Sequence, residues 1–191
     1  MKAYLYDMMM STLERVRLQN ERADLLSRCS GRVLEIGAGT GINFSLYGED
    51  EVYALEPDSI MASEAKKRIG SRDITLVEAS AESIPFEDDY FDTVVVCLAL
   101  CTIPDPHKAL AEIHRVCAPK GKLLVLEHIK NERSFLFRLQ NILTPLWKKF
   151  AMGCHLNRDT LKTIEENGFE CSSLKYFWGR NFVSGIYINR K

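Results

Sequence analysis

The sequence predicts an α/β fold: a mostly parallel sheet of seven strands with helices on both faces and an antiparallel strand pair at the C-terminal end. Short apolar runs alternate with helical stretches along most of the chain, which is typical of a parallel sheet with right-handed crossovers. Two of these runs, 94–96 and 123–126, are continuously apolar, as expected of strands covered on both faces. Two extended runs near the end, separated by Gly179 and Arg180, predict the antiparallel pair.

The individual elements follow from where the apolar runs begin and end. Pro57 and Pro106 are each followed by a helical pattern, so we expect a helix to begin at each of them. Residues 119–121 read Pro-Lys-Gly and predict a turn that enters the fifth strand. The expected strands are residues 32–36, 51–56, 74–78, 93–97, 122–127, 170–178 and 182–189.

Two segments lie outside this alternation. Residues 1–30 form an N-terminal segment with an amphipathic helical pattern from about residue 5 to residue 29. Residues 128–155 form a helical, aromatic-rich insertion, in which Pro145 is expected to break the helix. The insertion follows the C-terminal end of the fifth strand, where open α/β sheets bind ligands. It is compatible with a helix packed on the sheet, a lid over an apolar substrate pocket, or a helix that touches a membrane.

Composition limits the function classes. A chain of 191 residues with 46% hydrophobic residues suits one domain spanning residues 1–191. Its net charge of -1 provides no broad basic field, so we expect no nucleic acid partner. The six cysteines include no C-x-x-C pair, and no signal peptide or membrane-length apolar run opens the chain. We therefore expect a cytoplasmic protein without stable membrane insertion.

A glycine-rich loop after the first strand predicts a ligand site. Gly37, Gly39 and Gly41 let the backbone turn sharply and approach a ligand closely, and the next helix would point free N–H groups at it. Their spacing is G-x-G-x-G, whereas a dinucleotide fingerprint reads G-x-G-x-x-G, so the spacing argues against a nicotinamide-dependent oxidoreductase. The acid Glu56 ends the second strand and suits two hydrogen bonds to a ribose diol.

These features resemble motif I of the class I S-adenosylmethionine (SAM) methyltransferases, which implies a Rossmann-like fold and SAM as cofactor. Residues 80–82, Ser-Ala-Glu, resemble the family's adenine-binding loop, with Ser80 where the family usually has Asp. Either Ser80 or Glu82, or water, would then receive the adenine amino group. The segment 109–123 resembles the family's helix and following turn, with Lys120 at the first glycine position. The likeness spans roughly residues 25–127.

The resemblance implies a set of cofactor-binding residues around the glycine loop and the strand ends. Glu35 would position the cofactor's ammonium group or orient the loop by accepting its N–H bonds. The expected cofactor-binding residues are Glu35, Gly37, Ala38, Gly39, Thr40, Gly41, Asn43, Glu56, Pro57, Ser80, Ala81, Glu82, Cys97 and Leu98.

Two features of the sequence indicate the methyl acceptor: a motif that is missing after the fourth strand, and the sequence of the segment after residue 127. No Asn/Asp-Pro-Pro-Tyr/Phe set follows the fourth strand, which argues against methylation of planar amide or adenine nitrogens. Residues 127–129, 134–135, 145–147 and 153–158 resemble the methyltransferase-like 7 group, which methylates alkyl thiols. The resemblance thus implies a small-molecule acceptor, plausibly a thiol. A C-methyltransferase on a quinol-like ring, an N-methyltransferase on a lipid amine, and a non-catalytic SAM-binding module are the alternatives.

Few residues qualify for proton transfer, because SAM already carries an activated methyl group. His128, directly after the fifth strand, is the expected catalytic base, and His155 is second. Cys97 and Cys101 are candidate nucleophiles or, more simply, small packing residues. Glu127 is a candidate for binding an amine substrate. Tyr4 and Tyr6 are candidates for folding over the cofactor, no metal site is expected, and the oligomeric state stays open.

Overall fold

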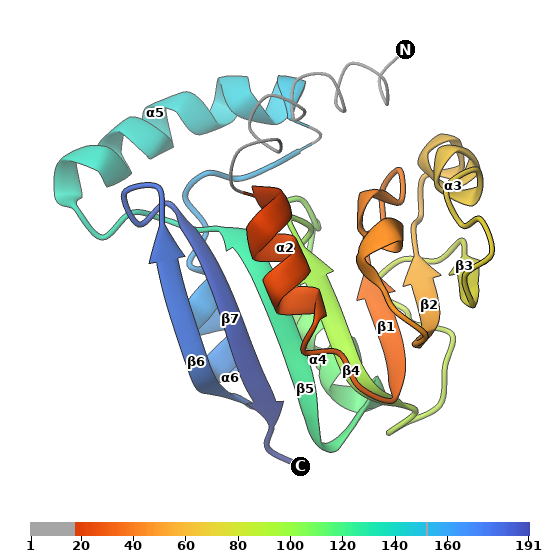
Figure 1. The fold of residues 1–191 in the computed structure, drawn as a ribbon. Coiled ribbons are helices and arrows are strands. Elements are labelled where there is room, and N and C mark those ends of the chain that lie inside the picture. Colours follow the sequence, from red (N-terminus) through yellow and green to blue (C-terminus); the bar gives the residue numbers. More distant parts are fainter. Residues whose placement is uncertain (1–17, 152) are drawn as a thin grey trace.

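The computed structural model describes residues 18–151 and 153–191, in which seven strands form one sheet of order β3-β2-β1-β4-β5-β7-β6. The first five strands pair in parallel, and β7 pairs antiparallel with both β5 and β6. The predicted fold class is therefore confirmed (Figure 1). The strands are β1 (Arg32–Ile36), β2 (Glu51–Leu55), β3 (Ile74–Val77), β4 (Phe91–Cys97), β5 (Cys117–His128), β6 (Phe169–Phe177) and β7 (Phe182–Asn189).

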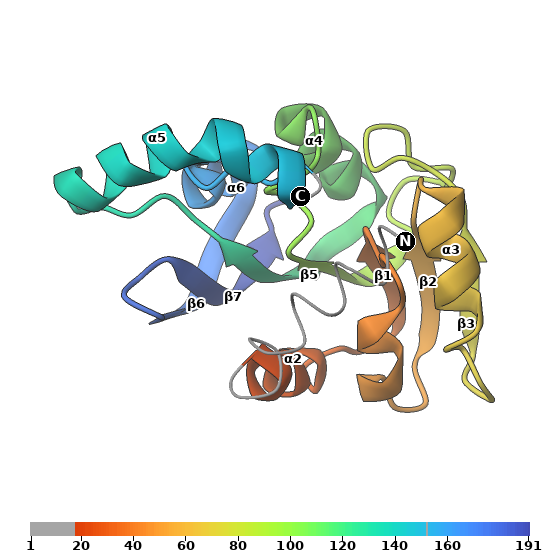
Figure 2. The same cartoon turned by 90° about the horizontal axis from the view of Figure 1, so that it is seen from above.

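Helices cover both faces of the sheet. Figure 2 shows α4 and α6 on one face and α2 on the other. The alternation of side chains along each strand explains this: Val94 packs toward the face under α4, while Val95 packs toward the face under α2. The helices are α2 (Gln19–Leu26), the short 3-10 helix η2 (Ile42–Leu46), α3 (Ser59–Lys66), α4 (Pro106–Val116), α5 (Ser134–Phe150) and α6 (Thr160–Glu166).

Side-chain caps fix two helix starts close to the predicted prolines. The Asp58 carboxylate accepts the backbone N–H groups of Ile60 and Met61, so α3 begins just after Pro57. Asp105 caps α4 in the same way, with Pro106 in the first turn. α3 begins four residues after the end of β2 and α4 nine residues after the end of β4, so both helices start from the edge of the sheet where these strands end.

Three sequence predictions need correction. β5 begins at Cys117, five residues earlier than predicted, because the Pro-Lys-Gly segment at 119–121 is an irregularity within the strand, with Lys120 in the left-handed region at φ 63°. α5 continues through Pro145 instead of breaking there. In the described part of the N-terminal segment, the helix is limited to Gln19–Leu26, and Tyr4 and Tyr6 lie outside the described residues.

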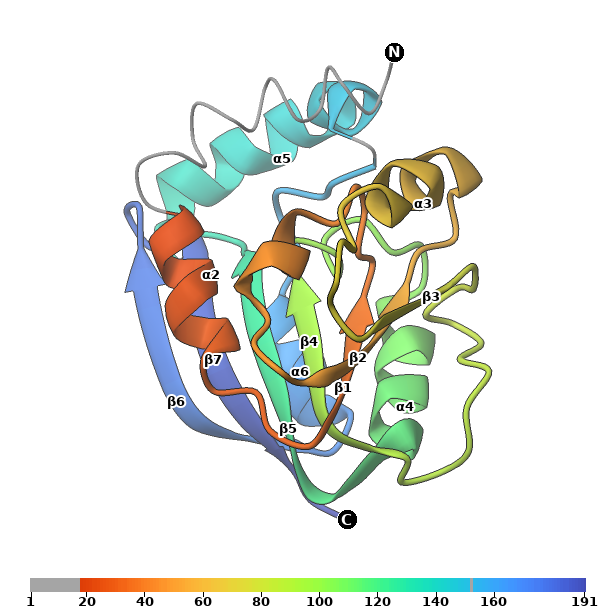
Figure 3. The ribbon, with the colours of Figure 1, turned by 45° about the vertical axis from the view of Figure 1, so that its right-hand side comes forward.

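The predicted insertion is a single helix placed at one end of the sheet. Figure 3 shows α5 lying across the end toward which the arrowheads of β1 and β4 point. Two hydrogen bonds of one side-chain amide connect it to the chain below: Gln140 accepts the Asn131 backbone N–H at 2.8 Å and donates to the Ile129 carbonyl at 3.2 Å. Among the described residues, no helix is both long and apolar enough to span a bilayer.

Candidate functional site

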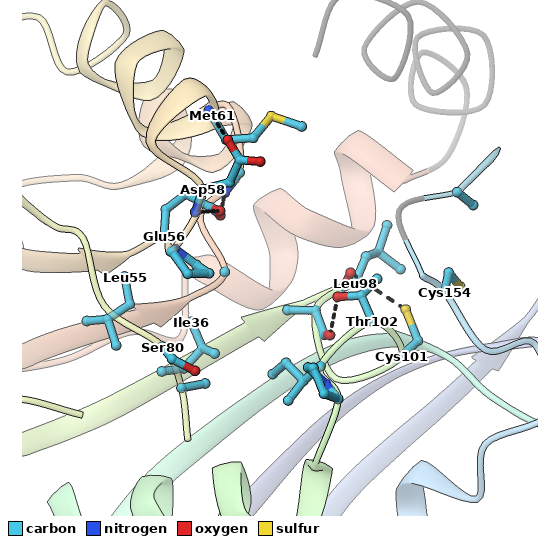
Figure 4. A pocket seen from close by; sticks show the side chains of 18 of the residues that line it. Ile36, Leu55, Glu56, Asp58, Met61, Ser80, Leu98, Cys101, Thr102 and Cys154 are labelled. Carbon is cyan, nitrogen blue, oxygen red and sulfur yellow. Dashed lines mark hydrogen bonds between the residues drawn. The ribbon is translucent and has the colours of Figure 1, made fainter. Parts of the chain in front are cut away.

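A cavity of about 330 Å³ lies at the C-terminal ends of β1, β2, β4 and β5. This is the edge at which open α/β sheets bind ligands, and the volume is that of a small-molecule site. Figure 4 shows two groups of labelled side chains on opposite sides of it, one around Glu56 and one around Cys101. We call the side formed by the lining residues from 36 to 81 the Glu56 half, and the side formed by the lining residues from 98 to 182 the Cys101 half. The lining residues are Ile36, Gly37, Gly39, Leu55, Glu56, Pro57, Asp58, Met61, Ala79, Ser80, Ala81, Leu98, Ala99, Cys101, Thr102, Ile103, Pro104, His128, Trp147, Ala151, Cys154, Leu156 and Phe182.

The glycine loop borders the Glu56 half with backbone alone. Gly37, Gly39 and Gly41 all adopt left-handed φ angles of 65°, 57° and 77°, which other residues reach only with strain. A Cβ on Gly37 would lie 2.8 Å from the Cβ of Ala99, so this position must be glycine for packing. A Cβ on Gly39 would meet nothing within 4 Å, because it would enter the cavity. The loop thus leaves a space at Gly39 that a bound ligand can fill.

Glu56 holds the glycine loop against the start of α3. One carboxylate oxygen accepts the Gly39 N–H at 2.8 Å, and the other accepts the Asp58 N–H at 3.0 Å. Burial raises the pKa of Glu56, while these two hydrogen bonds oppose the increase. Each oxygen keeps a further lone pair on the cavity side for a hydroxyl donor. The geometry therefore fits the diol-binding role that the sequence predicts.

The predicted adenine loop lies at the wall of the Glu56 half, but its acid points elsewhere. Ser80 and Ala81 line the cavity. The Glu82 carboxylate accepts the Asp105 N–H at 2.7 Å and the Ser80 hydroxyl at 3.1 Å, and it is not part of the lining. Of the two side chains considered for the adenine amino group, Ser80 is the one at the cavity.

Glu35 and Asn43 lie behind the loop in a buried polar network. Glu35 accepts the Asn43 side-chain amide at 2.7 Å and the Tyr47 hydroxyl at 3.0 Å, and Arg22 donates to Asn43 at 2.8 Å. Burial raises the pKa of Glu35 to about 7. Because neither Glu35 nor Asn43 lines the cavity, the structure gives them a role in supporting the loop from beneath.

Four more predicted residues also stay out of the lining. Ala38 donates its N–H to the Leu55 carbonyl at 2.9 Å, and Thr40 accepts Arg68 at 2.9 Å. Gly41 provides the left-handed residue before η2. Cys97 packs in the apolar cluster on the α2 side of the sheet, where burial raises its pKa to about 12, so its thiol stays protonated at neutral pH. Packing, not nucleophilic attack, therefore explains Cys97.

The Cys101 half is lined by uncharged side chains. His128 ends β5, and its ring meets Phe182 edge to face with centroids 5.0 Å apart. Its Nδ1 is buried without a hydrogen-bond partner among the described residues. Burial lowers the pKa of His128 to about 4, so the imidazole is neutral at physiological pH. The remaining lining here comes from the segment after β4, from Phe182, and from Trp147, Ala151, Cys154 and Leu156.

Two thiols meet in this half. The Cys101 thiol donates to the Leu98 carbonyl at 3.6 Å, and its interaction with Cys154 raises the pKa of Cys101 and lowers that of Cys154. Figure 4 shows both sulfur atoms on the same side of the cavity. His155, the second candidate base, is absent from the lining, and its backbone N–H donates to the Cys101 carbonyl at 2.8 Å. His155 therefore connects the insertion to the segment after β4.

Glu127 shapes the loop between the two halves. Its buried carboxylate accepts the N–H groups of Ala99 at 2.7 Å, Leu100 at 2.8 Å and Cys101 at 3.3 Å. Leu98, directly before them, lines the cavity with a left-handed φ of 57°, a conformation that the following hydrogen bonds hold in place. Since Glu127 is fully buried and outside the lining, an amine-binding role does not fit it.

The predicted residues therefore divide clearly. Those in the cavity wall are Gly37, Gly39, Glu56, Pro57, Ser80, Ala81, Leu98 and His128. Cys101, a candidate nucleophile in the sequence, also lies in the wall, whereas the sequence did not single out Asp58 and Met61 at the start of α3 or Ala99 and residues 102–104 after β4. Trp147, Ala151 and Cys154 belong to the insertion for which a lid over the pocket was one expected role, whereas Leu156 and Phe182 lacked a local signal, because they reach the cavity only through the fold. Among residues 18–151 and 153–191, no three His, Cys, Asp or Glu side chains gather as a metal site.

Comparison with known proteins agrees with this geometry. Residues 34–125 match a family model described as a methyltransferase domain. The chain is 32% identical to the human thiol S-methyltransferase TMT1B over 168 residues, which covers 80% of this chain and 69% of that protein. It is 33% identical to the rat protein of the same name over 151 residues and spans 62% of the length of that relative.

A second kind of relative is named for a different activity. The chain is 31% identical over 191 residues to the ubiquinone/menaquinone biosynthesis C-methyltransferase UbiE of Marinomonas sp., covering 86% of this chain and 74% of that protein. A solved S-adenosylmethionine-dependent methyltransferase from Mesorhizobium loti superposes with a TM-score of 0.69 at 15% identity, over 89% of this chain and 96% of that one. The last comparison establishes the fold alone.

Proposed function

Because the chain belongs to the methyltransferases that use S-adenosylmethionine, we propose that it methylates a small-molecule thiol. The observation that carries this proposal is the uncharged lining of the Cys101 half, where a neutral imidazole and two thiols stand among apolar side chains. A thiol is a soft, weakly hydrated group that such a lining suits. An ammonium acceptor would instead favour a carboxylate, and the described lining of this half holds none.

The Glu56 half is proposed to bind the cofactor. Glu56 would accept the ribose hydroxyls, the Gly37–Gly39 backbone would approach the amino acid tail, and Ser80 and Ala81 would border the adenine. When bound, SAM supplies a methyl group already activated by the sulfonium charge. The remaining task of the protein is to hold the acceptor sulfur in line with that group and to exclude water.

His128 is proposed to contact the acceptor as a neutral hydrogen-bonding group. A free thiol has a pKa near ~8.5, so moving its proton to an imidazole of pKa about 4 spans roughly 4–5 units, or about 6 kcal/mol. Because of this free-energy difference, His128 does not hold the proton of the acceptor thiol. The acceptor would therefore react as the thiolate that solution pH provides, with its proton released to solvent before methyl transfer and its negative charge balanced by the sulfonium of the cofactor instead of a charged side chain.

A panel of acceptors with methyl-labelled SAM tests the proposal. Alkyl and aryl thiols, a short-chain quinol and a dimethylated lipid amine would be incubated separately, and methylated products would be measured by mass spectrometry. We expect labelled thioethers from the thiols and far slower turnover of the other two classes. Turnover of the quinol or the amine with inert thiols would contradict the thiol assignment and favour one of the alternatives that the sequence left open.

A further inference from the structure

Helix α5 presents an unusual apolar surface to its surroundings. Of the eight large apolar side chains exposed among the described residues, seven belong to α5 and the eighth is Ile60 on α3. The largest exposures are 76% for Phe135, 75% for Ile142 and 69% for Phe150. Single exposed apolar residues are ordinary on a protein surface, but a contiguous cluster of seven marks a binding surface.

The seven residues share one side of the helix. From Phe135 they recur at i+4, i+7, i+8, i+11, i+12 and i+15, which spans about 140° of arc at ~100° per residue. The fully buried residues of α5 are polar, Gln140 and Thr144, and of its apolar side chains only Leu136 and Phe137 are half-buried. This is the reverse of a helix that packs on a sheet, and nothing among residues 18–151 and 153–191 covers the apolar side of α5.

The charges on α5 itself are of one sign. Residues 134–150 contain the three basic residues Arg138, Lys148 and Lys149 and no acidic one, although the whole chain has a net charge of -1. Arg138 and Lys149 flank the apolar side on α5. A symmetric pairing of two α5 helices would bring these cations together and would be opposed by their repulsion. An anionic surface with an apolar interior satisfies both the charge and the exposed side chains.

We propose that α5 is an interfacial helix that docks this protein on an anionic lipid bilayer, with Phe135, Ile142 and Phe150 entering the acyl boundary. The helix has 17 residues, about 25 Å at ~1.5 Å per residue, so it is too short to span a bilayer and lies along its surface. The proposal does not depend on which acceptor is methylated.

Docking through α5 would bring the bilayer to the mouth of the cavity. Trp147 is 38% exposed on the apolar side of α5 and also lines the cavity, and Ala151 follows directly after the helix. An apolar acceptor dissolved in the bilayer would then reach the Cys101 half without crossing water. The surface thus selects lipophilic acceptors by location, in addition to the selection made by the cavity lining.

Flotation of the full chain with vesicles tests the proposal. The protein would be mixed with vesicles of phosphatidylcholine and phosphatidylglycerol, and separately with vesicles of phosphatidylcholine alone. We expect flotation mainly with the anionic vesicles, weakened by added salt because the lipid charges are screened. The fluorescence of Trp147, measured in a Trp178→Phe variant, should shift to shorter wavelength with the same vesicles.

Variants separate the contribution of apolar insertion from that of charge. The triple change Phe135→Asn, Ile142→Asn and Phe150→Asn should weaken vesicle binding roughly tenfold or more. The double change Arg138→Gln and Lys149→Gln should weaken binding to anionic vesicles roughly thirtyfold, about fivefold per charge. Matched controls are Ile60→Asn, which is 66% exposed on α3, and Lys66→Gln, and neither should change vesicle binding.

Two results would overturn the proposal. One is full-chain protein that does not float with anionic vesicles at low salt. The other is a triple variant that floats as well as the unchanged protein. Sedimentation of the protein without lipid identifies the competing occupant, because a dimer that the triple variant dissociates would assign this surface to a second copy of the chain. A thiol panel that fails while vesicle binding persists would contradict only the proposed function.

Discussion

The two halves of the cavity are built in different ways. The Glu56 half consists of backbone and short side chains placed directly after β1, β2 and β3, and its key contacts are local, such as the 2.8 Å hydrogen bond from Gly39 to Glu56. The Cys101 half is assembled from segments far apart in the sequence, with His128, Cys154 and Phe182 meeting only in the fold. The first is suited to one constant ligand, and the second can change its acceptor by changing its side chains.

The largest effect should come from filling the space at Gly39. Gly39→Leu places a side chain in the cavity and forces a non-glycine residue to a φ of 57°, so we expect SAM affinity to fall roughly a hundredfold, about 2.7 kcal/mol. Titration calorimetry measures it. Gly70→Ala is the matched control, because Gly70 has a φ of 62° away from the cavity and imposes strain alone. Equal affinity in both variants would remove Gly39 from the cofactor site.

Glu127 should affect both halves, because its hydrogen bonds hold the loop that joins them. Glu127→Gln replaces a carboxylate that accepts three backbone N–H groups with an amide that has one oxygen, so we expect a loss of about 2 kcal/mol of stability. Urea unfolding gives this value. SAM affinity and the acceptor KM should both weaken in the same variant, and a change in only one of them would mean that the loop serves one half.

Glu56 should affect the cofactor alone. Removing its carboxylate in Glu56→Ala should raise the Kd for SAM roughly tenfold, because charge-assisted hydrogen bonds are lost. The acceptor KM, measured at saturating SAM, should stay within a factor of about two. Glu64→Ala is the control, since that carboxylate pairs with Lys67 at 2.7 Å and does not line the cavity. A similar loss in both variants would contradict the role given to Glu56.

Leu156 should give the opposite result from Glu56. Leu156→Ala enlarges the Cys101 half, so the KM for an apolar thiol should rise about fivefold, near the transfer energy of the lost carbons. The Kd for SAM should not change. If SAM affinity fell as much as acceptor affinity, the cofactor and the acceptor would not occupy separate halves of the cavity.

The smallest effect on activity is expected for a substitution of His128. The size of that effect distinguishes a hydrogen-bonding role from that of a general base. Because burial lowers the pKa of His128 to about 4, the imidazole is neutral above that pH and does not titrate near 6.5. The rate should therefore rise with pH up to the pKa of the thiol, in the unchanged protein and in His128→Asn alike. We expect His128→Asn to lower kcat/KM about threefold, whereas loss of a general base costs roughly a hundredfold or more.

The sequence predicted the Glu56 half better than the Cys101 half for a physical reason. Gly37, Gly39 and Glu56 follow strands that can be read from apolar runs, and parallel strands bring their C-terminal ends to one edge. Phe182 lies at that edge only because β7 inserts antiparallel between β5 and β6, and no local pattern reports that order.

Two misplaced residues show a second limit. Glu35 and Cys97 belong to strands that end at the cavity, so the strand pattern correctly predicted the edge of the sheet near which they lie. Their side chains point to the face under α2, however, and one position along a strand reverses the side. The exposed side of α5 could likewise not be separated from a packed side, because both require the same spacing of apolar residues.

A crystal structure with S-adenosylhomocysteine tests the division of the cavity most directly. We expect the ribose hydroxyls to lie within hydrogen-bonding distance of the Glu56 carboxylate, the adenine to lie beside Ser80 and Ala81, and the product sulfur to face His128. A complex with the ribose bound near Cys101 and Cys154, and Glu56 still held only by Gly39 and Asp58, would contradict it.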